Sequence, residues 1–130
     1  MRSVLFSMSF LLLMLNCTAV RADNADERVA LTALSQPDAV LIDVRTPEEF
    51  AQGSLPGARQ IEFDQIAGQI AAVAPDKSKP VILYCRSGRR SGIALKTLND
   101  LGYHNVINAG GYESLKQALN AQQTPACSNC

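Results

Sequence analysis

The chain has 130 residues, of which 47% are hydrophobic and 18% are charged, and its formal net charge at pH 7 is zero. This length suits one domain, and the composition supports a packed core and excludes a largely disordered chain. Because there is no excess of positive charge, we expect no nucleic-acid partner.

The first 22 residues have the pattern of a secretory signal peptide. A positive start at Arg2 precedes an apolar run from Val4 to Leu15, and Val20-Arg21-Ala22 places small or aliphatic residues where a signal peptidase cuts. We therefore expect cleavage after Ala22 and a periplasmic protein that keeps no stable membrane association.

Two other interpretations of this segment stay open. Arg2 and Arg21 bracket 18 uncharged residues, which is long enough for an uncleaved membrane anchor. Cys17 would suit a lipoprotein signal, although Asn16 stands where a small residue is preferred.

Beyond the signal, we expect a lead-in over residues 23–37, a domain over residues 38–120 and a polar tail over residues 121–130. The lead-in should contain a short helix whose apolar face lies near Val29, Leu31 and Leu34.

The predicted elements of the domain alternate between strand and helix. In chain order they are a strand over residues 39–44, a helix from Pro47, a short strand over residues 58–62, a helix from about residue 64, a strand over residues 81–84, a helix over residues 91–101, a strand over residues 105–108 and a helix after Gly111. The runs 39–44 and 81–84 are apolar and β-branched, as is typical of strands buried on both faces, and Thr46 before Pro47 is a helix cap. The alternation predicts an α/β fold with three layers, a central parallel sheet with helices on both faces.

One loop carries the chemistry. The sequence Cys85-Arg86-Ser87-Gly88-Arg89-Arg90-Ser91 follows the most apolar strand and leads into the helix that includes Ala94, Leu98 and Leu101 on its inner face. A thiol at this point faces backbone N–H groups without helical partners, and the helix dipole and three arginines add positive charge. These effects favour the thiolate of Cys85 over the thiol.

Gly88 would let this loop curl until its amides converge on one point, and such a cradle also binds an oxyanion. The pattern therefore predicts a nucleophilic sulfur beside an anion pocket, and a covalent intermediate on Cys85. A buried, inert cysteine flanked by surface arginines is the alternative.

Two further cysteines, Cys127 and Cys130, lie at the end of the tail. In an oxidising compartment they could pair with each other and leave Cys85 as the free thiol. They could instead form a dithiol that accepts sulfur from Cys85, or bind a soft metal, although two ligands make a weak metal site. We assign no metal site to the chain.

Several segments in this order resemble the rhodanese family. They are the loop from Cys85 to Ser91, the run Leu41-Ile42-Asp43-Val44-Arg45, Glu48-Glu49-Phe50 with Gly53-Ser54-Leu55-Pro56-Gly57-Ala58, and Leu101-Gly102-Tyr103 with Asn108-Ala109-Gly110-Gly111. Together they cover about residues 38–120, and the chain is most similar to small periplasmic rhodaneses of the phage-shock type.

The resemblance implies a rhodanese-like fold and thiosulfate sulfurtransferase activity without a cofactor. Cys85 would take the outer sulfur of thiosulfate, release sulfite and hold a persulfide, which cyanide or a thiol then discharges. We expect these small molecules to be the partners of a monomer.

The resemblance also assigns roles around Cys85. Its implied substrate-binding residues are Arg86, Ser87, Gly88, Arg89, Arg90, Ser91 and Arg45. Arg90 would face the sulfonate while Arg86 and Arg89 guide anions from the rim. Arg45 is equally well explained by an ion pair with Glu48 or Glu49, and Asp43 by a structural role in which it bonds loop amides.

Rival functions of the same fold are a phosphatase or an arsenate reductase, whose loop is one residue longer. Four residues separate Cys85 from Arg90, and this tighter spacing favours a single sulfur atom over a phosphoryl group. A sulfur carrier or partner-binding domain without catalytic turnover is the non-enzymatic alternative.

Overall fold

The computed structural model describes residues 23–124. The signal-peptide prediction for residues 1–22 and the predictions for Cys127 and Cys130 concern residues outside this range, so they stay predictions. Along the chain the elements are α1 (Asp23–Leu34), β1 (Val40–Asp43), α2 (Pro47–Gln52), β2 (Arg59–Gln60), α3 (Ile66–Val73), β3 (Val81–Cys85), α4 (Arg89–Asp100), β4 (Val106–Gly111) and α5 (Tyr112–Gln123).

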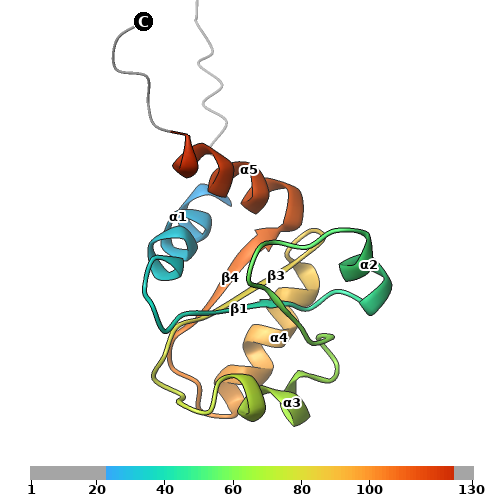
Figure 1. Ribbon diagram of the computed structural model, residues 1–130. Coiled ribbons are helices and arrows are strands. Elements are labelled where there is room, and N and C mark those ends of the chain that lie inside the picture. The colour runs from blue at the N-terminus through green and yellow to red at the C-terminus, as the bar shows by residue number, and fades with distance from the viewer. Residues whose placement is uncertain (1–22, 125–130) are drawn as a thin grey trace, which may run out of the picture.

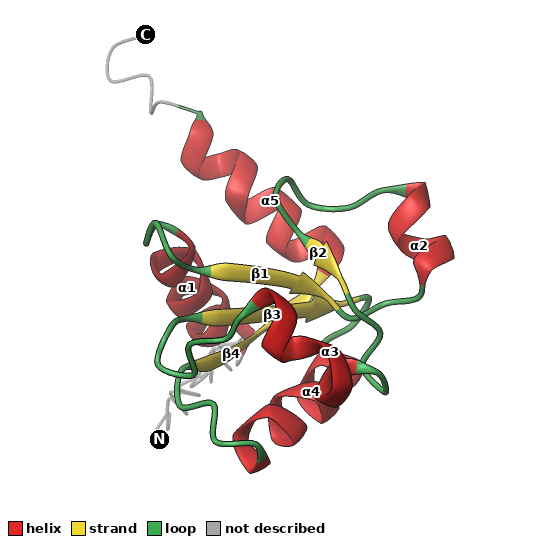
Figure 2. Ribbon diagram, turned by 60° about the horizontal axis from the view of Figure 1, so that its bottom comes forward, coloured by secondary structure: helices red, strands yellow, loops and turns green. Residues whose placement is uncertain are grey.

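The four strands form one sheet in the order β2-β1-β3-β4, and every neighbouring pair is parallel. Helices α1 and α5 cover one face of the sheet, and α3 and α4 cover the other (Figures 1 and 2). The predicted α/β class with a parallel central sheet is therefore confirmed. Within residues 23–124, no helix is long and apolar enough to cross a membrane.

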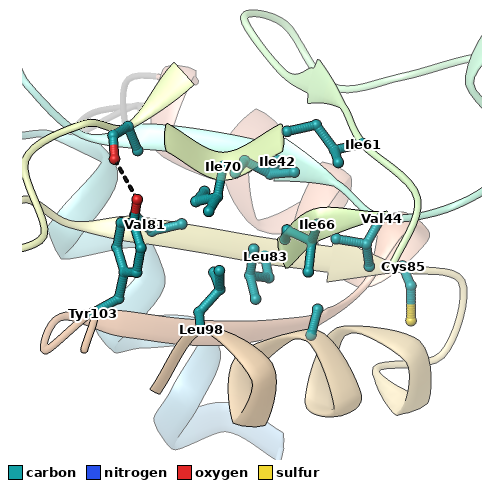
Figure 3. Close-up of a cluster of buried hydrophobic side chains, with 12 residues drawn as sticks. Ile42, Val44, Ile61, Ile66, Ile70, Val81, Leu83, Cys85, Leu98 and Tyr103 are labelled. Carbon is teal, nitrogen blue, oxygen red and sulfur yellow. Dashed lines mark hydrogen bonds between the residues drawn. The ribbon is translucent and has the colours of Figure 1, made fainter. Parts of the chain in front are cut away.

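The apolar strands supply two separate cores because alternate side chains point to opposite faces of a sheet. Ile42 and Leu83 belong to the core under α3 and α4, which Figure 3 shows with Cys85 at one end. Leu41, Ile82 and Tyr84 belong to the core under α1 and α5. Since the central strand β3 is buried along its whole length, its last residue is held in a fixed position.

Helix α1 buries only part of the predicted apolar face, because Leu31 and Leu34 pack against the core but Val29 does not. Ala30 and Ala33 are 0% and 5% exposed, whereas Val29 is 54% exposed. The helix lies against β4, and the small alanine side chains allow its backbone to come close to the sheet. Leu31 and Leu34 are only partly buried at the edge of this contact.

The helix after Cys85 begins at Arg89 and ends at Asp100, and not at Ser91 and Leu101 as predicted. Gly88 is its N-cap, so Arg89 and Arg90 belong to the first helical turn and the loop proper is shorter. Leu101 lies beyond the helix and is 39% exposed. Strand β4 continues to Gly111 and not only to Asn108, which carries the Gly110-Gly111 pair alongside Cys85.

Helix α2 begins with the cap that the sequence predicted. The Thr46 hydroxyl accepts a hydrogen bond from the Glu49 amide at 3.2 Å, and the Glu49 carboxylate accepts one from the Thr46 amide at 3.1 Å. This reciprocal capping box fixes the Glu49 side chain at the start of the helix.

Candidate active site

Cys85 is the last residue of β3, and its side chain is fully buried. Its sulfur accepts a hydrogen bond from the backbone N–H of Gly88 at 3.0 Å, and the Ser91 hydroxyl lies 3.5 Å from it. Both partners belong to the start of α4, the end at which a helix leaves backbone N–H groups without intrahelical partners. The strand thus presents the sulfur to the amino end of the next helix, as the sequence predicted.

These contacts shift the pKa of the Cys85 thiol. Burial by itself raises the pKa of the thiol, but the hydrogen bonds from the Ser91 hydroxyl and from the amides of Ser91, Ser87 and Gly88 outweigh it, so the pKa of Cys85 is lowered. Hydrogen bonds to the charged form stabilise that form, and a thiolate is the nucleophilic form of cysteine.

Two glycines, Gly88 and Gly111, allow the loop to close over the sulfur. Gly88 has φ = +92°, a left-handed conformation that residues with a Cβ rarely adopt, and a Cβ there would lie 3.2 Å from the Cα of Gly110. A Cβ on Gly111 would lie 2.8 Å from the carbonyl oxygen of Arg86. The predicted curl at Gly88 therefore depends on close packing against the Gly110-Gly111 backbone, which lies beside Cys85 in the sheet.

Asn108 holds this arrangement together, and the sequence analysis did not assign it a role. Its amide nitrogen donates to the carbonyl of Gly88 at 2.9 Å, and its amide oxygen accepts from the Gly110 amide at 3.0 Å and from the Ser91 hydroxyl at 2.7 Å. Asn108 pairs with Leu83 in the sheet, and a β-bulge in β4 directly after this pair brings Gly111 beside Cys85. No local sequence pattern predicts such an irregularity.

The single hydroxyl proton of Ser91 has two acceptors, the oxygen of Asn108 and the sulfur of Cys85. A neutral thiol leaves that proton on the short bond to Asn108, whereas a thiolate attracts it toward sulfur. Ser91 is fully buried, so water does not compete for this proton.

Arg90 is engaged by a residue that is distant in sequence. Its two terminal nitrogens donate to the two carboxylate oxygens of Glu49, at 2.7 and 3.0 Å. The guanidinium of Arg90 lowers the pKa of Glu49 to about 2, against burial and with help from the Thr46 amide. The Cys85 loop is thereby tied to α2.

Arg45 forms an ion pair, but with Asp43 and not with Glu48 or Glu49 as expected. Its guanidinium lies 2.6 Å from the carboxylate of Asp43, donates to the carbonyl of Gly53 at 2.7 Å and stacks 4.5 Å from the centre of the Tyr112 ring. The chain turns directly after β1, so the Arg45 side chain folds back onto the strand end. Asp43 also accepts a hydrogen bond from the Arg45 amide at 2.9 Å.

Two cavities flank the Cys85 loop. One, of about 400 Å³, is bordered by Ser87, Gly88 and Asn108. The other, of about 360 Å³, is bordered by Arg86, Arg45 and Glu49, among other residues. Arg86, Ser87 and Arg89 are exposed, as expected for rim residues. Residues 23–124 contain no group of three or more potential metal ligands.

Comparisons with known proteins point to one family. The sequence profile described as Rhodanese-like domain matches residues 27–118. The chain is 42% identical over 74 residues to thiosulfate sulfurtransferase PspE of Escherichia coli, covering 57% of this chain and 71% of that protein. It is 36% identical over 92 residues to a sulfurtransferase of Allochromatium vinosum, covering 71% of this chain and 80% of that one. A solved structure described as a rhodanese with anions from E. coli matches with a TM-score of 0.57 and 41% identity, over 58% of this chain and 88% of that chain.

The Ser91→Ala variant tests the hydrogen bond to sulfur. Because this bond stabilises the thiolate, its loss should raise the pKa of Cys85 and move the pH profile of alkylation by iodoacetamide toward higher pH. Below the midpoint of that profile, alkylation should be about three- to tenfold slower than in the wild type, while the alkaline plateau stays the same. An unchanged profile would mean that the backbone amides alone set the pKa.

The Gly111→Ala variant tests the close approach of the two backbones, and Gly68→Ala is its matched control. The new methyl at position 111 would displace the Arg86 carbonyl, so the free energy of unfolding should fall by about 1–3 kcal/mol and alkylation of Cys85 should slow. At position 68, within α3, the methyl would have no atom within 4 Å, and stability should rise by about 0.5–1 kcal/mol. Urea unfolding and alkylation rates measure both; a fully stable and reactive Gly111→Ala protein would contradict the packing argument.

Proposed function

The chain belongs to the rhodanese-like domain family, and because the two relatives described above are named as sulfurtransferases, we propose that it is a thiosulfate sulfurtransferase that carries sulfur as a persulfide on Cys85. The observation that carries this proposal is the buried sulfur of Cys85, which accepts a hydrogen bond from Gly88 at the amino end of α4. This setting stabilises a negative sulfur atom, and both the thiolate and the persulfide are negative.

The reaction has two steps. In the first, the Cys85 thiolate attacks the outer sulfur of thiosulfate, a new S–S bond forms, the S–S bond of thiosulfate breaks, and sulfite leaves with the electron pair. In the second, cyanide or a thiolate attacks the outer sulfur of the persulfide, and Cys85 recovers its thiolate with the electron pair of the broken bond. No external oxidant, reductant or cofactor enters either step.

The loop residues have distinct roles in this proposal. The amides of Ser87, Gly88 and Ser91 stabilise the negative sulfur, and the exposed Arg86 and Arg89 attract the dianionic donor toward the loop. The pKa of the Arg90 guanidinium is raised mainly by its hydrogen bond to Glu49 and in smaller part by the charge of the nearby Cys85 thiolate. In this proposal Arg90 binds the sulfonate of the donor. Arg45 has a structural role in this proposal, in which its ion pair with Asp43 holds the turn after β1 in place.

The geometry favours this function over a phosphatase or an arsenate reductase. The Gly88 amide reaches the sulfur at 3.0 Å, so the cradle encloses the sulfur closely. A phosphoryl group needs several amides directed at oxygens that lie outside the sulfur, and a four-residue spacing to Arg90 leaves less room for them. A carrier domain without turnover shares the persulfide but would release it slowly to small acceptors.

We also place the enzyme outside the cytoplasm, after cleavage near Ala22, as a monomer. The signal-like pattern of residues 1–22 supports export. Cys85, Ser91, Asn108 and Glu49 come from one chain, so the site needs no second copy.

A thiosulfate–cyanide assay tests the function. The wild-type protein should form thiocyanate with double-displacement kinetics, since the first product leaves before the second substrate reacts. Cys85→Ser should lose at least about 10³-fold in rate because the nucleophile is gone. Neither protein should hydrolyse a chromogenic phosphate ester.

Two results would contradict the proposal. Equal thiocyanate formation by wild type and Cys85→Ser would exclude the persulfide route. Phosphate-ester hydrolysis by the wild type, without thiocyanate formation, would assign the loop to phosphoryl chemistry.

A further inference from the structure

Arg90 and Glu49 form a two-pronged charge pair beside the Cys85 loop. Both terminal nitrogens of the guanidinium are bonded to the carboxylate, at 2.7 and 3.0 Å, and each side chain is 26% exposed. A fork of two parallel N–H···O bonds is the strongest geometry that a guanidinium offers to a carboxylate. It is also the geometry in which a guanidinium binds other planar or tetrahedral oxyanions.

The Glu49 carboxylate is held in place before any ligand arrives. One of its oxygens, Oε2, also accepts a hydrogen bond from the Thr46 amide at 3.1 Å, in the capping box of α2. Because its pKa lies near 2, this carboxylate is ionised at every pH at which the protein would work. Arg90 therefore faces a permanent, positioned anion that belongs to the protein itself.

An anionic donor meets this pair when it approaches Cys85. Arg86 and Arg89 are exposed and free to attract it from solution, but Arg90, in the first turn of α4, already binds a carboxylate. In the proposed function, the sulfonate oxygens of the donor would accept from the same two Arg90 nitrogens that now bond Glu49. The two anions also repel each other when both are present.

We propose that Glu49 is a specificity-determining residue that competes with the anionic donor for Arg90. Glu49 occupies Arg90 in the resting protein, gives way to the sulfonate when the donor binds, and returns as the anionic product leaves. This inference rests on the proposed function for the identity of the donor. Competition by Glu49 makes anion binding weaker than the three arginines alone would make it. It also assists the departure of sulfite after the S–S bond of thiosulfate breaks.

A structural clamp is the competing explanation of the same contacts. If Glu49 only ties α2 to the Cys85 loop, its loss would loosen the anion site and weaken binding. The two explanations therefore predict opposite changes in anion affinity when the charge of Glu49 is removed.

The Glu49→Gln variant separates them. Glutamine keeps the oxygen that accepts from the Thr46 amide, so the capping box is retained while the charge is lost. Glu48→Gln is the matched control, since Glu48 is the preceding residue, carries the same charge and is exposed. The probe is sulfate, a dianionic oxyanion without a transferable sulfur, added at constant ionic strength maintained with chloride.

The measurement is the protection by sulfate of Cys85 against iodoacetamide, a neutral reagent. The rate with sulfate is compared with the rate without it for each variant separately, so differences in thiol reactivity cancel. Glu49→Gln should lower the sulfate dissociation constant about three- to tenfold, and Glu48→Gln should change it less than twofold. In an Arg90→Gln background the Glu49→Gln change should lose its effect, as a double-mutant cycle requires for a direct interaction.

Weaker or unchanged sulfate binding by Glu49→Gln would overturn the proposal and leave Glu49 as a clamp. If circular dichroism shows that Glu49→Gln does not fold, Glu49→Asp replaces it. Its shorter side chain withdraws the carboxylate from Arg90 and should also tighten sulfate binding. An unchanged dissociation constant for sulfate in Glu49→Asp would overturn the proposal. The readout does not involve sulfur transfer. If the wild type lacks thiosulfate activity but Glu49→Gln binds sulfate more tightly, the proposed function is wrong and the competition for Arg90 still holds.

Discussion

The hydrogen bond from the Gly88 amide to the Cys85 sulfur is the contact on which the active site depends. It requires the left-handed conformation of Gly88, and it requires the Arg86 carbonyl to come close to Gly111, where a Cβ would obstruct the loop. Asn108 then bonds the Gly88 carbonyl, so the peptide that follows the turn is held from the other side. The bulge in β4, the glycine pair and the start of α4 together position the amide that donates a hydrogen bond to the Cys85 sulfur.

The charges around this sulfur are arranged in pairs. Arg45 is bound to Asp43 at the end of β1, and Arg90 is bound to Glu49 at the start of α2. Both pairs lie near the carboxyl ends of the parallel strands. Because Arg45 and Arg90 are occupied, the exposed Arg86 and Arg89 are the cations that a ligand meets first. Attraction of an anion and stabilisation of the reacting sulfur are thus carried by different groups, exposed guanidinium ions for the first and backbone amides for the second.

Much of the fold could be predicted from the sequence because its signals are local. The apolar runs that became β1 and β3, the Thr46 cap of α2 and the place of Cys85 between a strand and a helix all follow from neighbouring residues. What could not be predicted depends on residues that meet only in three dimensions. Asn108 bonds to Gly88 and Ser91, and Arg90 bonds to Glu49. These bonds join residues separated by 17 to 41 positions in the sequence. The start of α4 was misplaced by two residues because two arginines after a glycine suit a helical turn as well as a loop.

The mass of the protein after treatment with thiosulfate tests the central claim, that this cradle holds a persulfide on Cys85, most directly. A gain of about 32 Da should map to the peptide that contains Cys85 and should disappear when cyanide is added. No gain on that peptide, or a gain that remains in Cys85→Ser because it sits on Cys127 or Cys130, would contradict the account.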